Sequence, residues 1–172
     1  NLSSDDEDSA RKIFRINKDG KMVYFLDVQE LKCADGDINV ICPGKVLRYS
    51  PFSKDMDCIA REARDLGALT SIGQPVKSAE SVRRLLQEGL VDFFDAWDAL
   101  NTEKNNRKNR DILYNLSDQI PRDRRKAQGL AVSDGHRDSD LGISNSEIQM
   151  SFDGTKEFYD SLKMAEVTYW NI

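Results

Sequence analysis

The chain has 172 residues, of which 39% are hydrophobic and 32% charged, and its formal net charge is -5. The length suits one ordinary domain with a large insertion, and the acidic balance argues against nonspecific binding of nucleic acid or anionic membranes by the whole surface. The chain contains no apolar run of about 18 residues, so a transmembrane helix is not expected. Its three cysteines include no CxxC pair, which favours a reduced intracellular protein over a disulfide framework.

The first part of the chain indicates an acidic tail followed by short β-strands. Residues 1–10 are rich in serine and acidic side chains, which is typical of a solvated, disordered tail. Apolar and β-branched runs then predict strands at 13–16, 22–28, 38–42 and 45–49. Glycine-containing turns separate these runs, because glycine reaches the positive φ that tight turns need. We therefore expect Gly20 and Gly44 to be structural turn residues.

The middle of the chain has helical periodicity. Ser53 is a good N-cap for a helix that Gly67 ends, and Ser78 caps a second helix. We predict this second helix to be the strongest in the chain, with Gly89 in its middle. Its apolar positions recur at spacings of three and four: Val82, Leu85, Leu86, Leu90, Phe93, Phe94, Trp97 and Leu100. A third helix over 112–120 ends at Pro121.

The C-terminal part returns to β-structure. A flexible loop at about 133–146 precedes a predicted strand over 148–152, an Asp153-Gly154 turn, a short helix and a closing strand over 167–170. The simplest arrangement joins these last strands to the first ones. We therefore predict a single α+β domain over 11–172. Its small β-barrel or sheet would be built from the N- and C-terminal strands, with a helical insertion or subdomain at about 53–130.

Few residues suggest chemistry. His136, the only histidine, lies among aspartates, but a lone loop histidine is more often a surface residue than a general base. No Cys/His spacing supports zinc, and no glycine-rich phosphate loop occurs. Asp95 and Asp98 are at helical spacing, which indicates a solvated helix face. We expect no enzymatic activity, no catalytic residue, no cofactor and no metal.

A basic segment over 104–126 stands out in this acidic chain. Its cations are Lys104, Arg107, Lys108, Arg110, Arg122, Arg124, Arg125 and Lys126. They suit contact with an acidic protein or with phosphates, although a solvated connector is the simpler interpretation. Arg122, Arg124, Arg125 and Lys126 are our candidate partner-binding residues. Tyr114 is the only aromatic residue in the segment, so base stacking and nucleic-acid binding are not expected.

Two blocks of the sequence resemble the replication-foci-targeting-sequence (RFTS) domain. This domain is known from maintenance DNA methyltransferases and from a subunit of the fungal cullin-4 heterochromatin ubiquitin ligase complex (CLRC). The first block covers 14–27 and 38–49, in which strands alternate with glycine turns. The second covers 147–170 and includes Phe152-Asp153-Gly154 and Ala165-Glu166.

The resemblance implies a non-catalytic protein-interaction or targeting domain of a nuclear, chromatin-associated protein. Such a domain would scaffold a cullin-type ubiquitin ligase in heterochromatin, with proteins rather than membranes as partners. One alternative is the autoinhibitory or targeting domain of a DNA methyltransferase. Others are a small enzyme with scattered site residues and a chromodomain-like histone reader. The reader needs an aromatic cage, for which the candidates are Tyr24, Phe25, Tyr49 and Phe52.

Overall fold

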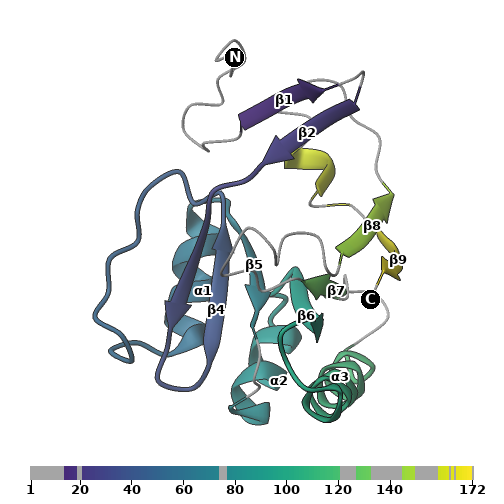
Figure 1. The fold of residues 1–172 in the computed structure, drawn as a ribbon. Coiled ribbons are helices and arrows are strands. Elements are labelled where there is room, and N and C mark those ends of the chain that lie inside the picture. Colours follow the sequence, from purple (N-terminus) through teal and green to yellow (C-terminus); the bar gives the residue numbers. More distant parts are fainter. Residues whose placement is uncertain are drawn as a thin grey trace.

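The centre of the protein is an open, mixed five-stranded sheet (Figure 1). The computed structural model describes residues 14–18, 21–73, 77–120, 127–132, 145–149, 159–162, 164 and 166–171. The sheet has the order β3 (Val28–Lys32), β4 (Asp37–Ile41), β5 (Leu69–Ile72), β6 (Phe93–Asp98) and β7 (Gln128–Val132). Neighbours from β3 to β5 are antiparallel, whereas β5, β6 and β7 are parallel. The carboxyl ends of β5–β7 therefore meet at one edge, where β4 begins.

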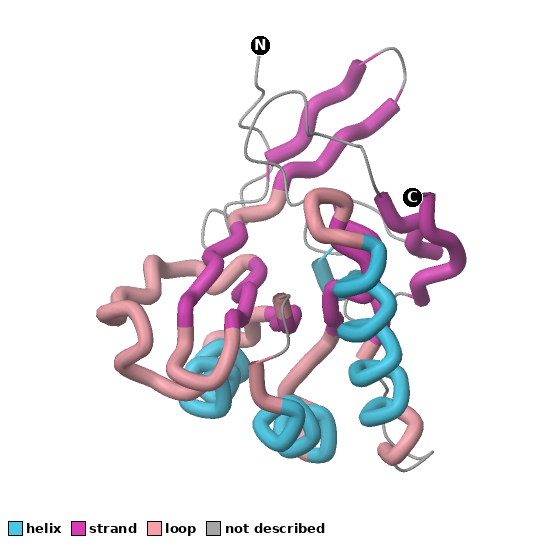
Figure 2. Tube along the Cα trace, turned by 60° about the horizontal axis from the view of Figure 1, so that its bottom comes forward, coloured by secondary structure: helices cyan, strands magenta, loops and turns pink. Residues whose placement is uncertain are grey.

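Three helices pack on one face of this sheet (Figure 2). They are α1 (Met56–Asp65), α2 (Ala79–Gln87) and α3 (Glu103–Ser117). The side chains of Ser78 and Thr102 accept hydrogen bonds from the first turns of α2 and α3, which satisfies amides that a helix leaves unpaired. Their apolar stripes bury a continuous core against Val40, Ile72 and Phe94. No described helix has the length and apolarity required to cross a membrane.

The opposite face of the sheet is apolar where β5 and β6 begin and polar farther along these strands. Ile41, Leu69 and Phe93 form a second apolar cluster with Tyr159 and Leu162. The hydroxyl of Tyr159 donates to the carbonyl of Gly67 at 2.6 Å, which ties the chain end to the turn after α1. Because side chains alternate along a strand, the residues two positions after Leu69 and Phe93 lie on this same face. These residues are Ser71 and Asp95, and both are polar.

The predicted α+β class is confirmed, but the strands are paired differently from the expected arrangement. β1 (Phe14–Lys18) pairs with β2 (Lys21–Phe25), and β8 (Asn145–Gln149) pairs with β9 (Glu166–Asn171), each in a separate two-stranded sheet. In the described part of the chain, the first and last strands thus share no sheet, and the central sheet is open rather than a barrel. Residues 53–130 contain the three helices and also supply β5, β6 and the start of β7, which take the positions beside β4.

The predicted long helix after Ser78 is wrong beyond Gln87. Gly89 has φ 62° and ends α2, and the chain continues as β6. The error has a physical cause, because a strand buried on both faces also supplies apolar residues three and four positions apart. The predicted strand over 22–28 is likewise divided between β2 and β3, and the one predicted over 45–49 is loop. The predicted tail at 1–10 lies outside the described residues, as does the predicted loop up to 144.

Candidate functional site

Polar side chains gather where β5 and β6 end and β4 begins. We call this group the carboxyl-edge site, and its members are Lys32, Asp37, Ser71, Lys77 and Asp95. Strand register brings them together, because Lys32 pairs with Asp37 across β3 and β4, and β4 pairs with β5. In open sheets with parallel strands, ligands bind outside the carboxyl ends of the strands. The position of this group is therefore where a functional site is expected.

Asp37 is the buried anion of the site. It is only 5% exposed, and its two carboxylate oxygens accept from different lysines: Oδ1 from Lys77 at 2.7 Å and Oδ2 from Lys32 at 3.1 Å. A carboxylate so buried requires such partners, since an unpaired one would lose its hydration without compensation. The backbone carbonyl of Asp37 also accepts from the amide of Gly73 at 3.0 Å, which fixes the chain leaving β5.

Both lysines keep a surface that a ligand can reach. The side chains of Lys32 and Lys77 are 46% and 39% exposed. A hydrogen bond to Glu30, and then the hydrogen bond and charge of Asp37, raise the pKa of Lys32, although partial burial opposes them. Lys32 is therefore cationic at neutral pH. Each ammonium group already has a carboxylate partner, since Lys32 pairs with Glu30 as well as Asp37 and Lys77 pairs with Asp37, but both retain exposed surface at which they can donate to a ligand.

Ser71 and Asp95 form the second half of the site. Both are buried, and the Ser71 hydroxyl donates to Asp95 Oδ1 at 3.2 Å. Gly73 lies between the two carboxylates: a Cβ placed on it would be 3.6 Å from Asp37 Cβ and 3.8 Å from Asp95 Oδ2. The site therefore holds two carboxylates, a hydroxyl and two ammonium groups within a small region. Such groups can transfer a proton and donate hydrogen bonds to a ligand.

The carboxyl end of β6 is held in place by α3. Asn106 is 1% exposed. Its side-chain oxygen accepts from the backbone amide of Asp98 at 3.0 Å, and its side-chain nitrogen donates to the backbone carbonyl of Asp98 at 2.8 Å. This side chain reproduces the pair of bonds that a neighbouring strand would make. The Asp98 carboxylate in turn accepts from the amide of Leu100 at 2.8 Å. The end of the strand that carries Asp95 is thus anchored by buried hydrogen bonds.

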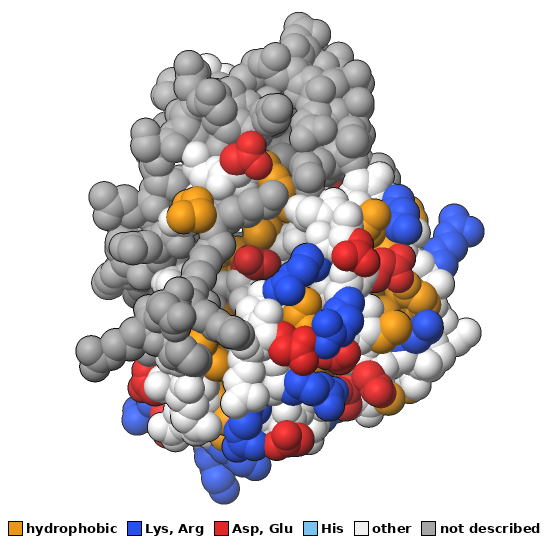
Figure 3. Space-filling model, turned by 180° about the vertical axis from the view of Figure 1, so that it is seen from behind, with side chains coloured by type: hydrophobic (Ala, Val, Ile, Leu, Met, Phe, Trp, Pro, Cys, Tyr) orange, Lys and Arg blue, Asp and Glu red, His pale blue; other side chains and the backbone are white. Residues whose placement is uncertain are grey.

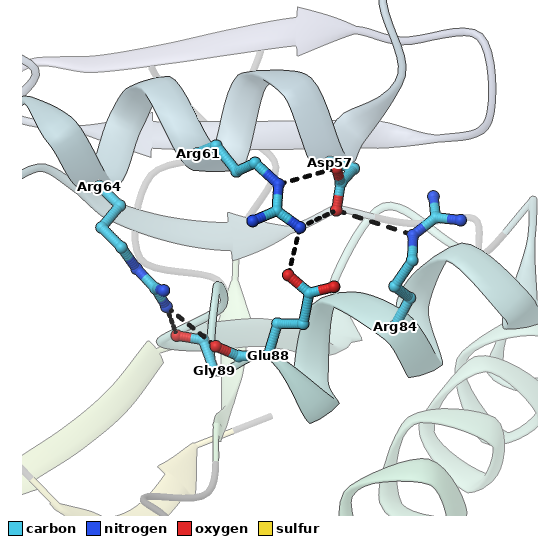
Figure 4. A network of polar contacts seen from close by, with 6 residues as sticks. All are labelled: Asp57, Arg61, Arg64, Arg84, Glu88 and Gly89. Atoms are coloured by element: carbon cyan, nitrogen blue, oxygen red, sulfur yellow. Dashed lines mark hydrogen bonds and ion pairs between the residues drawn. The ribbon is translucent and has the colours of Figure 1, made fainter.

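A cluster of arginines between α1 and α2 has a different role (Figure 4). Arg61 donates to Asp57 at 3.0 Å and to Glu88, while Arg64 donates to the backbone carbonyls of Glu88 and Gly89. Each of these guanidinium groups is already bonded, so the cluster joins two helices. Figure 3 shows cations and anions interspersed over the face behind the view of Figure 1, which is typical of a solvated surface.

The sequence-based candidates are not among the residues of the carboxyl-edge site. Arg122, Arg124, Arg125 and Lys126 lie outside the described residues, and so do Gly20, Asp153, Gly154 and His136. Gly44 has φ 72°, the left-handed conformation that favours glycine. From the basic segment, Arg107 on α3 forms an ion pair with Glu103 at 2.6 Å. Of the four aromatic cage candidates, the side chains described are Tyr49 and Phe52.

Sequence reasoning missed the site because it assigned Asp95 to a helix. The prediction of a solvated helix face at Asp95 and Asp98 is wrong, since both residues are buried on β6. The available signal was Gly89 followed by an apolar run that ends in aspartates, which is typical of a strand leading into a site. Asp37 falls in the glycine-containing turn predicted between the strands at 22–28 and 38–42, and no local pattern marks Lys32 or Lys77 as its partners.

The described residues at and near the carboxyl-edge site do not indicate a metal site or a reactive thiol. Among the residues that the structure describes, no group of three His, Cys, Asp or Glu side chains is arranged to hold a metal ion. Burial, reinforced by Asp35 and Asp37, raises the pKa of the Cys33 thiol to about 11, so it remains protonated at neutral pH. Cys42 is also buried, whereas Cys58 is exposed.

Comparisons with known proteins define the fold. No family model matches the chain, and no curated protein matches it. It is similar to the crystal structure of PsfC from Pseudomonas syringae PB-5123, with a TM-score of 0.58 and 12% identity, over 90% of this chain and 65% of that one. It is also similar to the lesion-specific endonuclease PfuEndoQ from Pyrococcus furiosus, with a TM-score of 0.59 and 13% identity, over 98% of this chain and 45% of that one. The chain thus spans less than two thirds of either protein.

Proposed function

We propose that the carboxyl-edge site binds a phosphate ester and hydrolyses it. Support comes from one observation above all: two lysines and a Ser71–Asp95 pair converge where the parallel strands end. Ammonium groups neutralise a phosphate, and a carboxylate next to it is suited to proton transfer. The similarity in fold to a lesion-specific endonuclease, a class that cleaves phosphodiester bonds, is consistent with this substrate chemistry.

In this proposal each residue has a defined task. Lys32 and Lys77 hold the phosphate oxygens, and Asp37 keeps both ammonium groups in position. Asp95 takes a proton from a water molecule as the water oxygen forms its bond to phosphorus and the ester P–O bond breaks. The leaving oxygen, on the opposite side of the phosphorus, takes a proton from solvent and departs as an alcohol, and Asp95 returns its proton to solvent. Ser71 orients the Asp95 carboxylate through its hydroxyl.

The proposal is tested by hydrolysis of bis(p-nitrophenyl) phosphate with the purified chain, in EDTA and with added Mg²⁺ or Mn²⁺. Removing a general base typically costs about 100-fold or more in rate, so we expect at least that loss in Asp95→Asn. Asp111→Asn is the matched control, because Asp111 is an exposed residue of α3 that pairs only with its neighbour Arg110 in the described contacts. Absence of turnover in all three conditions, or equal rates in the two variants, would contradict hydrolysis here.

A second candidate is the non-catalytic interaction domain that the RFTS resemblance implies, in a nuclear chromatin complex such as a cullin-type ligase. The observation in its favour is that both oxygens of Asp37 are engaged by lysines, an arrangement that organises a surface without requiring turnover. This candidate predicts partner binding with no hydrolysis. Affinity purification with the tagged chain as bait tests it, and the absence of chromatin proteins and ligase subunits among the captured proteins would exclude it.

A further inference from the structure

The loop between β4 and α1 differs from the rest of the chain in charge. Residues 44–54, which we call the basic–aromatic loop, contain Lys45, Arg48 and Lys54 and no acidic residue, together with Tyr49 and Phe52. The whole chain has 30 acidic against 25 basic residues, so this loop is a local reversal of sign. One of its cations, Lys45, pairs with Glu62 at 3.3 Å. Arg48 and Lys54 are exposed.

The loop follows the outer edge of β3 toward the carboxyl-edge site (Figure 1). At its start, the Gln29 side chain donates to the carbonyl of Lys45 at 3.2 Å and accepts from the amide of Leu47 at 2.8 Å. Farther on, the amide of Phe52 donates to the carbonyl of Lys32 at 2.8 Å. Because Lys32 belongs to the carboxyl-edge site, these bonds place Phe52 at its border.

Phe52 is held there in an unfavourable conformation and remains open to solvent. Its φ is 62°, a region in which a bulky residue is a clear outlier, and the residue is 60% exposed. Neither core packing nor turn chemistry requires a phenylalanine at such a position. The Lys77 ammonium group lies 5.7 Å from the centre of the Phe52 ring and 2.7 Å from Asp37 Oδ1. A single lysine therefore connects the exposed ring with the buried carboxylate.

We infer that Phe52 is a stacking platform for a base of single-stranded nucleic acid, whose phosphates contact Arg48, Lys54 and Lys77. This inference rests on the proposed function and names the substrate class. Aromatic rings beside cations are the usual means of binding single strands, since every base has a face that stacks. The neighbouring cavity, lined in part by Lys32, Tyr49 and Lys54, has a volume of about 140 Å³. This is less than the roughly 300 Å³ at which enclosed ligand pockets begin, so the base would lie on the open ring.

The test measures binding of a fluorescein-labelled oligothymidylate by fluorescence anisotropy at low and moderate salt. Phe52→Gly removes the ring but relieves the backbone, because glycine adopts a φ of 62° without strain. We expect this variant to melt no lower than the original chain and to bind about five- to a hundredfold more weakly. Phe52→Trp should retain the affinity. Val46→Ala, another exposed apolar position of the same loop, is the matched control and should bind normally.

The outcomes separate this inference from the proposed function. Turnover of bis(p-nitrophenyl) phosphate without oligonucleotide binding would overturn the inference and leave hydrolysis standing. Equal affinity in Phe52→Gly and Val46→Ala would also overturn it, as would displacement of the oligonucleotide by polyglutamate at equal charge concentration, because charge alone would then explain binding. Loss of affinity in Arg48→Ala with a salt slope reduced by about 0.7 supports a phosphate contact.

Discussion

Substitution of Asn106 tests how the end of β6 is kept in position. The side-chain amide of Asn106 makes both of its described hydrogen bonds to the backbone of one buried residue, Asp98. The two bonds, 3.0 Å and 2.8 Å long, satisfy the amide and the carbonyl of Asp98 at the end of β6. Replacement of Asn106 by alanine removes this partner from the buried Asp98 amide, whereas the Asp98 carbonyl still accepts from the Asn101 amide at 3.2 Å. Since β6 also carries Asp95, the change acts on the strand that positions the proposed general base.

The expected cost follows from the Asp98 amide. Leaving one buried donor unsatisfied costs about 1–3 kcal/mol, and alanine regains up to about 0.7 kcal/mol through its higher helix propensity. We therefore expect Asn106→Ala to lower the free energy of unfolding by about 0.5–3 kcal/mol. Asn105→Ala is the control one position away. The Asn105 side chain is exposed and donates only to Asn101 among the described contacts, so its removal should change stability by less than about 0.5 kcal/mol.

Urea unfolding followed by circular dichroism measures both variants, with the free energy obtained by linear extrapolation. Asn106→Leu serves as a second variant, because its apolar side chain occupies the space that water would otherwise enter. We expect it to lose at least as much stability as Asn106→Ala. Equal stability of the Asn105→Ala and Asn106→Ala proteins would refute the reasoning, since the Asp98 amide would then not depend on Asn106.

Three further predictions concern packing, pH and salt. Gly129→Ala should lower the free energy of unfolding by about 1–3 kcal/mol, because the new Cβ would lie 2.7 Å from the Tyr114 hydroxyl. Gly36→Ala is the control. The atoms close to its new Cβ belong to the flexible side chain of Met56, so thermal melts should show a smaller loss of stability. The unfolded thiol of Cys33 ionises near its ordinary pKa of 9.0, but the folded one ionises only at about 11. Stability present below pH 9 should thus fall by up to about 2–3 kcal/mol toward pH 11, and pH-dependent melts of Cys33→Ala should be flatter. Asp57→Asn breaks exposed ion pairs and should cost under about 1 kcal/mol, with a difference that vanishes in high salt.

Local patterns predicted the elements whose signals depend on neighbouring residues. Ser78 is the N-cap of α2, as predicted, and Gly67 lies just past the end of α1, whose N-cap is Asp55 rather than the predicted Ser53. The helix predicted over 112–120 overlaps the second half of α3, which begins earlier, at Glu103, and ends at Ser117. In contrast, the apolar run after Gly89 fits a helix stripe and a doubly buried strand equally well. Its state depends on β5 and β7 lying beside it, which no local pattern encodes.

The site illustrates the same division. Asp37 and Asp95 are separated by 58 positions in the chain, and by local sequence each alone is an ordinary turn or surface aspartate. Their relation appears only when β4 lies against β5 and β5 against β6, which places Gly73 between them. Lys77 pairs with Asp37 over a separation of 40 residues. Reasoning from spacing therefore had no means of bringing the two lysines and the two carboxylates together.

The sequence by itself determined the mixed α+β composition, the start of α2 after Ser78 and the turns at Gly44 and Gly67. These depend on side-chain periodicity and on backbone freedom within a few residues. The tertiary structure alone decided which strands are neighbours, which polar side chains are buried, and that an exposed phenylalanine borders a buried aspartate. Those properties arise from long-range pairing, and the free energy of a pairing depends on both partners rather than on either segment alone.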